Sequence, residues 1–182
     1  MIELSQRDIP CADGPGVCID TLVIACGNPM RGDDGVGPEV ASRVEARFAD
    51  RENNPHRFII THQLLPEFAY ELAQARQAVL IDARVMGGDP VGVVRTGSIK
   101  PERLTYGHDQ TGRDARAGLT HHWTFPRLLA VAEALYGRAP HAYAVSVSAK
   151  DFDHGDSLTP TIAAAVPTMC DAVRKLIEQH HE

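Results

Sequence analysis

Three places in the chain carry side chains that are suited to binding a metal ion. Asp33 and Asp34 stand next to each other in the segment GNPMRGDDGVG. Asp82 lies at the end of the apolar run AVLIDA, and His121 and His122 form an adjacent pair further along. Two carboxylates and an imidazole with open coordination positions make a reasonable site for a divalent transition metal. Such a site requires a fold that brings the three places together.

The order of apolar segments predicts such a fold. A continuous apolar run predicts a buried strand at 21–26, and helical spacing of apolar residues predicts a helix to about residue 49. Further strands are expected at 57–62, 78–83, 91–99 and 142–148, with helices from Pro66, across 123–135 and across 159–177. The alternation predicts a three-layer α/β/α sandwich around a mostly parallel sheet of about five strands. Ligands in such folds bind beyond the carboxyl ends of the strands, where Asp34, Asp82 and the histidine pair are expected to meet.

The composition is that of one soluble globular domain. The chain has 182 residues, 43% of them hydrophobic and 23% charged, with a formal net charge of −6. We expect a single domain over residues 21–178, preceded by a flexible extension over 1–20. The negative charge disfavours nucleic acids and anionic membranes as partners, since both attract basic patches. Neither a signal peptide nor an apolar stretch of bilayer length is recognisable, which predicts a cytoplasmic protein.

Each candidate residue also has a purely structural interpretation. The aspartate pair can cap a helix and hold a turn, and Asp82 can accept hydrogen bonds from neighbouring backbone groups. Adjacent histidines on a loop are often only solvated. Cys26 ends the first strand beside the aspartate loop, and is more often a small buried residue than a nucleophile.

Motifs of other enzyme classes are missing from the sequence. The glycines around the aspartate pair match neither G-x-G-x-x-G nor G-x-x-x-x-G-K-[ST], so nucleotide binding is weakly indicated. No G-x-S-x-G elbow and no H-E-x-x-H helix occur, which disfavours serine hydrolases and ordinary zinc proteases. The cysteines are scattered without a C-x-x-C pair, which speaks against a structural zinc site.

Four blocks in order resemble the hydrogenase maturation endopeptidases, which trim the C-terminal extension from the large subunit of [NiFe] hydrogenases. GNPMRGDDGVGPEVASRVE is similar to the loop and helix that follow the first strand in that family. LIDA resembles the strand that ends in a metal-binding aspartate, and THHWTFPRLLAVAEALYGRAP resembles the segment that carries a metal-binding histidine. Leu158-Thr159-Pro160 is similar to the opening of the last helix. The resemblance covers about residues 21–177.

The resemblance implies a peptidase of aspartic type with Asp34 and Asp82 as catalytic residues and as metal ligands. The third ligand is His121 or His122: helical phase favours His121, whereas a gapless count back from Gly137 favours His122. The metal is nickel that the hydrogenase large-subunit precursor already carries, so no tightly bound cofactor of the enzyme's own is expected. Asp33 either orients the loop or acts as a base, and the sequence leaves both open.

The chain departs from the family beside this loop. Many members have a Gly-Thr turn after the second strand, where this chain has His62-Gln63-Leu64, and the segment 106–118 forms a long loop rich in glycine and charge. One alternative is therefore a nickel-sensing or chaperone-like binding protein that keeps the site without proteolysis. A second is a small α/β hydrolase or nucleotide-binding enzyme that shares only the fold.

Overall fold

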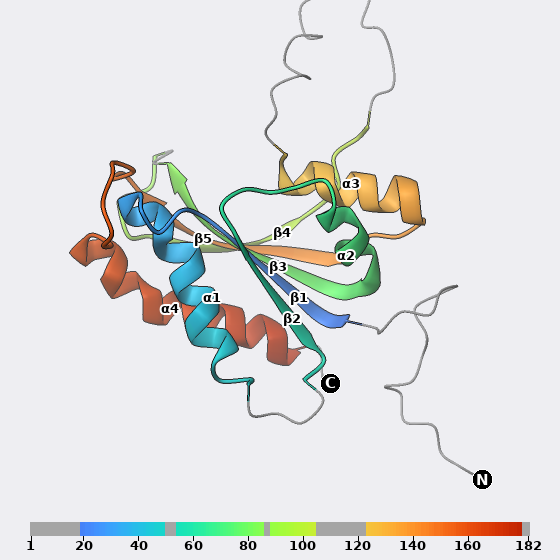
Figure 1. The fold of residues 1–182 in the computed structure, drawn as a ribbon, viewed down its shortest axis with the longest axis horizontal. Helices are drawn as coiled ribbons and strands as arrows, with labels where there is room; N and C mark the ends of the chain where they lie inside the picture. The colour runs from blue at the N-terminus through green and yellow to red at the C-terminus, as the bar shows by residue number, and fades with distance from the viewer. Residues whose placement is uncertain (1–18, 50–53, 86–87, 105–122, 180–182) are drawn as a thin grey trace, which may run out of the picture.

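The computed structural model describes residues 19–49, 54–85, 88–104 and 123–179 (Figure 1). The predicted loop over 106–118, the histidine pair and residues 1–18 of the predicted extension over 1–20 lie outside these residues, whereas the last two residues of that extension belong to the first strand. The described elements are β1 (Ile19–Cys26), η2 (Gly32–Gly35), α1 (Val36–Glu45), β2 (His56–Thr61), α2 (Phe68–Gln74), β3 (Ala75–Val85), β4 (Val94–Ile99), α3 (Phe125–Tyr136), β5 (His141–Ala149) and α4 (Pro160–Glu178).

In the described part of the chain, five strands form one sheet in the order β2-β1-β3-β5-β4. The pairings of β1 with β2, β1 with β3 and β3 with β5 are parallel, whereas β4 pairs antiparallel with β5 at the edge. This confirms the predicted α/β fold with a mostly parallel sheet. The central strand β3 is longer than the predicted 78–83, because its first and last residues continue the ladder beyond the apolar run.

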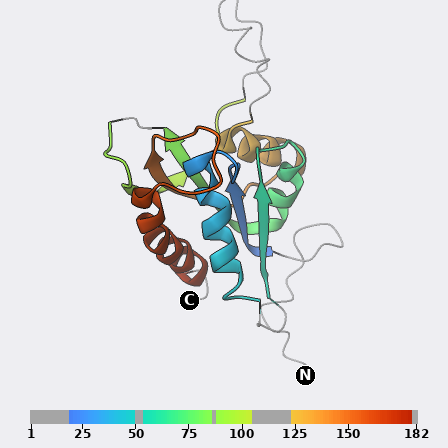
Figure 2. The same ribbon diagram turned by 60° about the vertical axis from the view of Figure 1, so that its left-hand side comes forward.

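Helices cover both faces of the sheet, as Figure 2 shows. Helices α1 and α4 pack against each other on one face, and α2 and α3 pack against each other on the opposite face. Successive strand residues alternate between these faces. In β1, Val23 and Ala25 contribute to the core under α1 and α4, whereas Leu22 and Ile24 contribute to the core under α2 and α3. The arrangement is the predicted three-layer sandwich.

Several element ends differ from the prediction. Helix α2 begins at Phe68 rather than Pro66, after a turn in which Phe68 and Ala69 donate to the carbonyls of Leu65 and Pro66. Helix α1 ends at Glu45, although the chain continues in turns that keep Phe48 buried. The end of α3 was predicted correctly, since Gly137 takes a left-handed conformation with φ +74° and its N–H donates to the Glu133 carbonyl.

Among the described residues, no helix is both long and apolar enough to cross a lipid bilayer.

Candidate functional site

Cys26 and Asp82 lie side by side at the carboxyl edge of the parallel strands. Strand pairing matches Ala25 of β1 with Ile81 of β3, so the next residues along the two strands are Cys26 and Asp82. Both continue the alternation of the face that carries α2 and α3. On the other side of β3, Asp82 pairs with Ser146 of β5. A row of polar side chains therefore crosses the sheet at this edge.

The loop after β1 brings Asp34 to the same edge. Gly27 turns the chain away from β1 with φ +143°, and a Cβ atom there would lie 1.9 Å from the Asp34 carbonyl oxygen. Only glycine fits this position, because an L side chain is strained at that φ and would also collide with backbone. The Asn28 N–H then donates to Asp34 Oδ2 at 2.8 Å. This hydrogen bond fixes the carboxylate relative to the strand end.

Helix α1 starts directly above the strand ends. A Cβ atom on Gly37 would lie 2.4 Å from the Cys26 carbonyl oxygen and 3.0 Å from the Ile81 carbonyl oxygen. The missing side chain lets the first turn of the helix rest against the backbone of β1 and β3. The two strands, the loop and the helix thus hold Asp34 and Asp82 in one compact arrangement.

The two carboxylates influence each other electrostatically. Burial, together with the negative charge of Asp34, raises the pKa of Asp82 from its usual value of 3.8 to about 7, against a hydrogen bond from the Ala83 backbone. A carboxyl group with a pKa near neutral pH can exchange a proton during a reaction, or can be deprotonated by a bound cation. The structure therefore brings together the two acids that the sequence singled out.

Cys26 is a neutral thiol in this environment. Burial raises its pKa to about 11, and the charges of Asp82 and Asp34 raise it too, in spite of backbone hydrogen bonds at Gly27 and Leu64. Nucleophilic cysteines require the thiolate, which positive neighbours stabilise. The site therefore favours the interpretation of Cys26 as a packing residue over its interpretation as a nucleophile.

Asp33 points away from this pair and links two distant parts of the chain. Its side chain is fully buried, and its Oδ1 accepts a hydrogen bond of 2.8 Å from the Thr159 N–H at the start of α4. Thr159 makes no capping hydrogen bond with its own side chain, so the Asp33 carboxylate is the side chain that holds the start of α4 to the aspartate loop. Of the two roles that the sequence left open for Asp33, this contact favours loop orientation.

The segment before α4 holds the aspartate loop through further backbone contacts. The N–H groups of Gly32 and Asp33 donate to the carbonyls of Gly155 and Asp151, each at 3.0 Å, and the Gly155 N–H donates to the Met30 carbonyl. Figure 2 shows the two loops side by side at one end of the molecule. The position of Asp34 thus depends on residues more than a hundred positions later in the chain.

The predicted histidine ligands cannot be placed, because His121 and His122 lie outside the described residues. The next residues are described: Trp123 packs against the core under α2 and α3, and the Thr124 side chain caps α3 by accepting from the Arg127 N–H. Within the described residues, no group of three or more His, Cys, Asp or Glu side chains is arranged to hold a metal ion.

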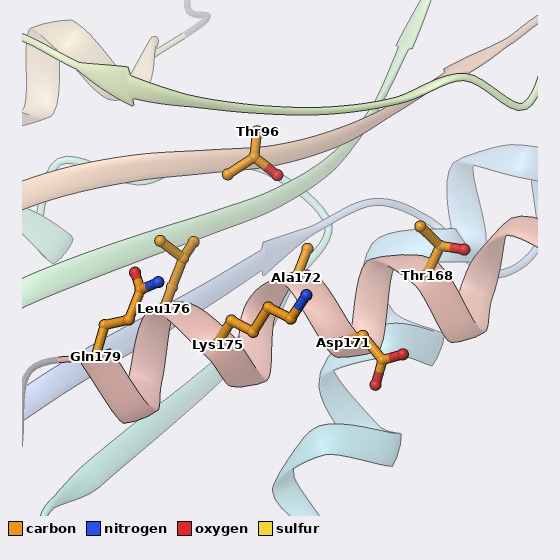
Figure 3. A pocket seen from close by; sticks show the side chains of 7 residues that line it. All are labelled: Thr96, Thr168, Asp171, Ala172, Lys175, Leu176 and Gln179. Carbon is orange, nitrogen blue, oxygen red and sulfur yellow. The ribbon is translucent and has the colours of Figure 1, made fainter.

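Asp34 and Asp82 do not line either of two hollows on the described surface. One, of about 460 Å³, lies between Thr96 of β4 and the outer turns of α4 (Figure 3). Thr96 faces the α4 side of the sheet, opposite to the face of Asp82. The other, of about 320 Å³, lies between the aspartate loop and the start of α4, where Pro29, Gly35 and Leu158 line it.

A basic group beside the site escaped the sequence analysis. Arg84 and Arg95 both bind Asp89, and all three stand close to the polar row that contains Asp82. The sequence did indicate the position of Arg84, because in the strand segment LIDAR a residue two positions after Asp82 shares its face of the sheet. Arg95 carries no such signal, because its place depends on the antiparallel register of β4.

No protein-family model matches the chain, and no curated protein matches its sequence at a significant level. Solved structures do match its fold. The [NiFe] hydrogenase maturation protease HybD from Thermococcus kodakarensis has a TM-score of 0.60 and 19% identity, over 87% of this chain and 99% of that chain. The hydrogenase maturating endopeptidase HybD from E. coli has a TM-score of 0.59 and 18% identity, over 89% and 94%. The [NiFe] hydrogenase maturation protease HycI from Thermococcus kodakarensis KOD1 has a TM-score of 0.61 and 15% identity, over 88% and 93%. The chain therefore has the fold of the [NiFe] hydrogenase maturation proteases, in agreement with the family that its motifs resemble.

Proposed function

We propose that this protein is an endopeptidase that removes the C-terminal extension of a [NiFe] hydrogenase large-subunit precursor after nickel has been inserted. The observation that carries the proposal is the pair Asp34 and Asp82, held together at the carboxyl edge of a sheet of this fold. The similar structures named as hydrogenase maturation proteases and the four motif blocks support the same reaction class.

In this proposal the nickel ion belongs to the substrate. Asp34, Asp82 and one of His121 and His122 bind the nickel of the precursor, so that only a precursor that contains the metal is held in place. Carboxylate and imidazole are suitable ligands for nickel, and a cation close to Asp82 favours its deprotonated form. The enzyme thereby recognises that metal insertion is complete.

The chemical step is the addition of water across one peptide bond. A cation that contacts the scissile carbonyl oxygen stabilises the negative charge that develops there, and a nearby carboxylate accepts the proton of the attacking water. The proton is then passed to the leaving amine. Asp33 takes no part in this step, because its carboxylate is buried and bonded to the start of α4.

The test is a processing assay with nickel-loaded and nickel-free precursor. The wild-type protein is expected to shorten only the loaded precursor, and Asp34→Asn and Asp82→Asn are expected to leave it unprocessed while melting cooperatively. Asparagine is preferred to alanine because its amide oxygen can still accept the Asn28 N–H. Asp171→Asn on α4 is the matched control, since this exposed aspartate is ion-paired to Arg174 far from the sheet edge.

His121→Ala and His122→Ala, assayed separately, identify the third ligand as the one whose loss abolishes processing. Normal cleavage by Asp34→Asn or Asp82→Asn contradicts the proposed site. Nickel-dependent binding of precursor without any cleavage by the wild-type protein contradicts the peptidase activity and favours the non-proteolytic binding protein instead.

A further inference from the structure

A basic cluster of Arg84, Asp89 and Arg95 lies next to the candidate site. Asp89 Oδ2 accepts from Arg84 at 2.6 Å and from Arg95 Nε at 3.2 Å, and Asp89 Oδ1 accepts from Arg95 at 2.6 Å. Hydrogen bonds from Arg95 and then Arg84 lower the pKa of Asp89 to about 2, so this carboxylate stays ionised. Two guanidinium groups and one carboxylate leave the cluster with one net positive charge, although the chain as a whole is acidic.

The cluster shares the face and the edge of the sheet with Asp82. Arg95 pairs with Ser146, which in turn pairs with Asp82 on its other side. Neighbouring strands are about 4.8 Å apart, so the backbone of Arg95 lies about 10 Å from that of Asp82, across the sheet. Arg84 follows Asp82 by two positions on the same strand, which corresponds to about 7 Å. An extended peptide covers about 10 Å in three residues.

The guanidinium groups retain unused hydrogen-bond donors. Asp89 occupies one nitrogen of Arg84, and Arg84 Nε is buried with no hydrogen-bond partner among the described residues. The Arg95 side chain is 64% exposed, in contrast to 23% for Asp89 beneath it. The buried Nε of Arg84 is out of reach of a ligand, so the donors open to one are on the exposed side of the cluster, chiefly on Arg95. An arginine whose plane is already fixed by a carboxylate loses less entropy on binding a second one. The cluster is therefore prepared to accept an anionic group.

We propose that Arg95 and Arg84 form a specificity subsite that binds an acidic side chain of the substrate polypeptide, about three residues from the bond that is cleaved. The inference rests on the proposed peptidase function for the placement of that bond near Asp34 and Asp82. Asp89 acts as the positioning residue that holds both arginines toward the substrate. A carboxylate is the group that fits, because it matches the two parallel N–H groups of a guanidinium and is the common anion of polypeptides.

The test compares Arg95→Gln with Arg174→Gln. Arg174 is a matched control, since it is also a partly exposed arginine that is ion-paired to an aspartate, but it lies on α4. Arg95→Gln is expected to raise the KM for nickel-loaded precursor up to about fivefold with kcat unchanged, as for the loss of one exposed ionic contact. Arg174→Gln is expected to change neither. The KM of the wild type is expected to rise with salt more steeply than that of Arg95→Gln.

A charge-neutralising scan of the precursor identifies the bound group. Each Asp and Glu within about four residues of the cleavage point is replaced by Asn or Gln. For the residue bound by the subsite, the replacement is expected to raise KM with the wild-type enzyme and to have no further effect with Arg95→Gln, because the two changes remove the same contact. Additive effects at every position, or an unchanged KM for Arg95→Gln, would overturn the proposal.

A binding measurement separates this inference from the peptidase proposal. A labelled synthetic peptide that spans the cleavage point is titrated with wild-type protein, Arg95→Gln and Arg174→Gln, and its fluorescence anisotropy is followed. Weaker binding by Arg95→Gln alone supports the subsite even if the wild type cleaves nothing. Equal binding by all three proteins refutes the subsite even if the wild type is an active peptidase.

Discussion

Replacement of Asp33 distinguishes a structural from a chemical role for the first of the adjacent aspartates. Its Oδ1 accepts from the Thr159 N–H at 2.8 Å, in an environment where the side chain is fully buried. Asp33→Ala removes the acceptor and leaves the half-buried Thr159 N–H at the start of α4 without this partner. Asp33→Asn retains an amide oxygen that can occupy the same position, while it removes the negative charge and any ability to act as a base.

The expected change in stability of each variant follows from whether the hydrogen bond to Thr159 is lost or kept. An unsatisfied buried backbone donor costs about 1–3 kcal/mol. For a chain of this size, each kcal/mol lowers the melting temperature by roughly 2–4 °C, so Asp33→Ala is expected to melt about 2–12 °C below the wild type. Asp33→Asn is expected to stay within about 1 kcal/mol of the wild type, because the hydrogen bond to Thr159 is preserved.

Thermal unfolding and precursor processing, measured on the same samples, test this reasoning. Asp33→Asn is expected to process nickel-loaded precursor at nearly the wild-type rate, and Asp33→Ala to process it less well because the loop that carries Asp34 loses its support. If Asp33→Asn melts like the wild type but its rate falls by a factor of about 10²–10⁴, as on loss of a general base, the structural assignment of Asp33 is refuted.

Three further predictions concern the sheet edge. The pKa of Asp82 is about 7 in the folded chain against a usual value of 3.8, so the folded state holds the extra proton between these values and stability falls as pH rises toward 7. Asp82→Asn is therefore expected to unfold at a higher temperature than the wild type at about pH 8 and to lose this advantage below about pH 4, as thermal melts across the pH range will show. Gly37→Ala is expected to destabilise the protein and impair processing, since its Cβ would lie 2.4 Å from a strand carbonyl, whereas Gly97→Ala, with nothing within 4 Å, is expected to be tolerated in the same melts and assays. Cys26→Ala is expected to keep its processing activity, and iodoacetamide is expected to alkylate Cys26 slowly at neutral pH, because burial raises the thiol pKa to about 11; rapid alkylation in a peptide-mapping experiment contradicts the neutral thiol.

The parts of the site that depend on local pattern were predictable from the sequence. The apolar runs of β1 and β3 determine which residues are buried in the middle of a parallel sheet, and such runs end at the same edge. That geometry places Cys26 and Asp82 at one edge, whereas the return of Asp34 to this edge also depends on contacts between its loop and the segment before α4. The need for glycine at position 27 is also local, because the chain must leave the strand at a positive φ to return Asp34 to its end.

The parts that depend on distant contacts were not predictable. The direction of β4 is decided by its pairing with β5, and this pairing brings Arg95 level with Ser146. The partner of Asp33 lies 126 residues later in the chain, and no spacing within the aspartate loop indicates it. Periodicity describes a segment and its neighbours, whereas these contacts arise from the packing of complete elements.

The contact between the aspartate loop and α4 determines when, during synthesis, the loop that carries Asp34 can reach its final position. A ribosome releases β1 and the loop first and α4 last, so the Asp33 carboxylate has no Thr159 N–H to accept from until nearly the whole chain has emerged. A nascent or truncated chain can form the early strands, but its loop lacks the support that fixes Asp34. The edge of the sheet that carries Asp34 and Asp82 is thus completed only when the segment before α4 has reached the aspartate loop.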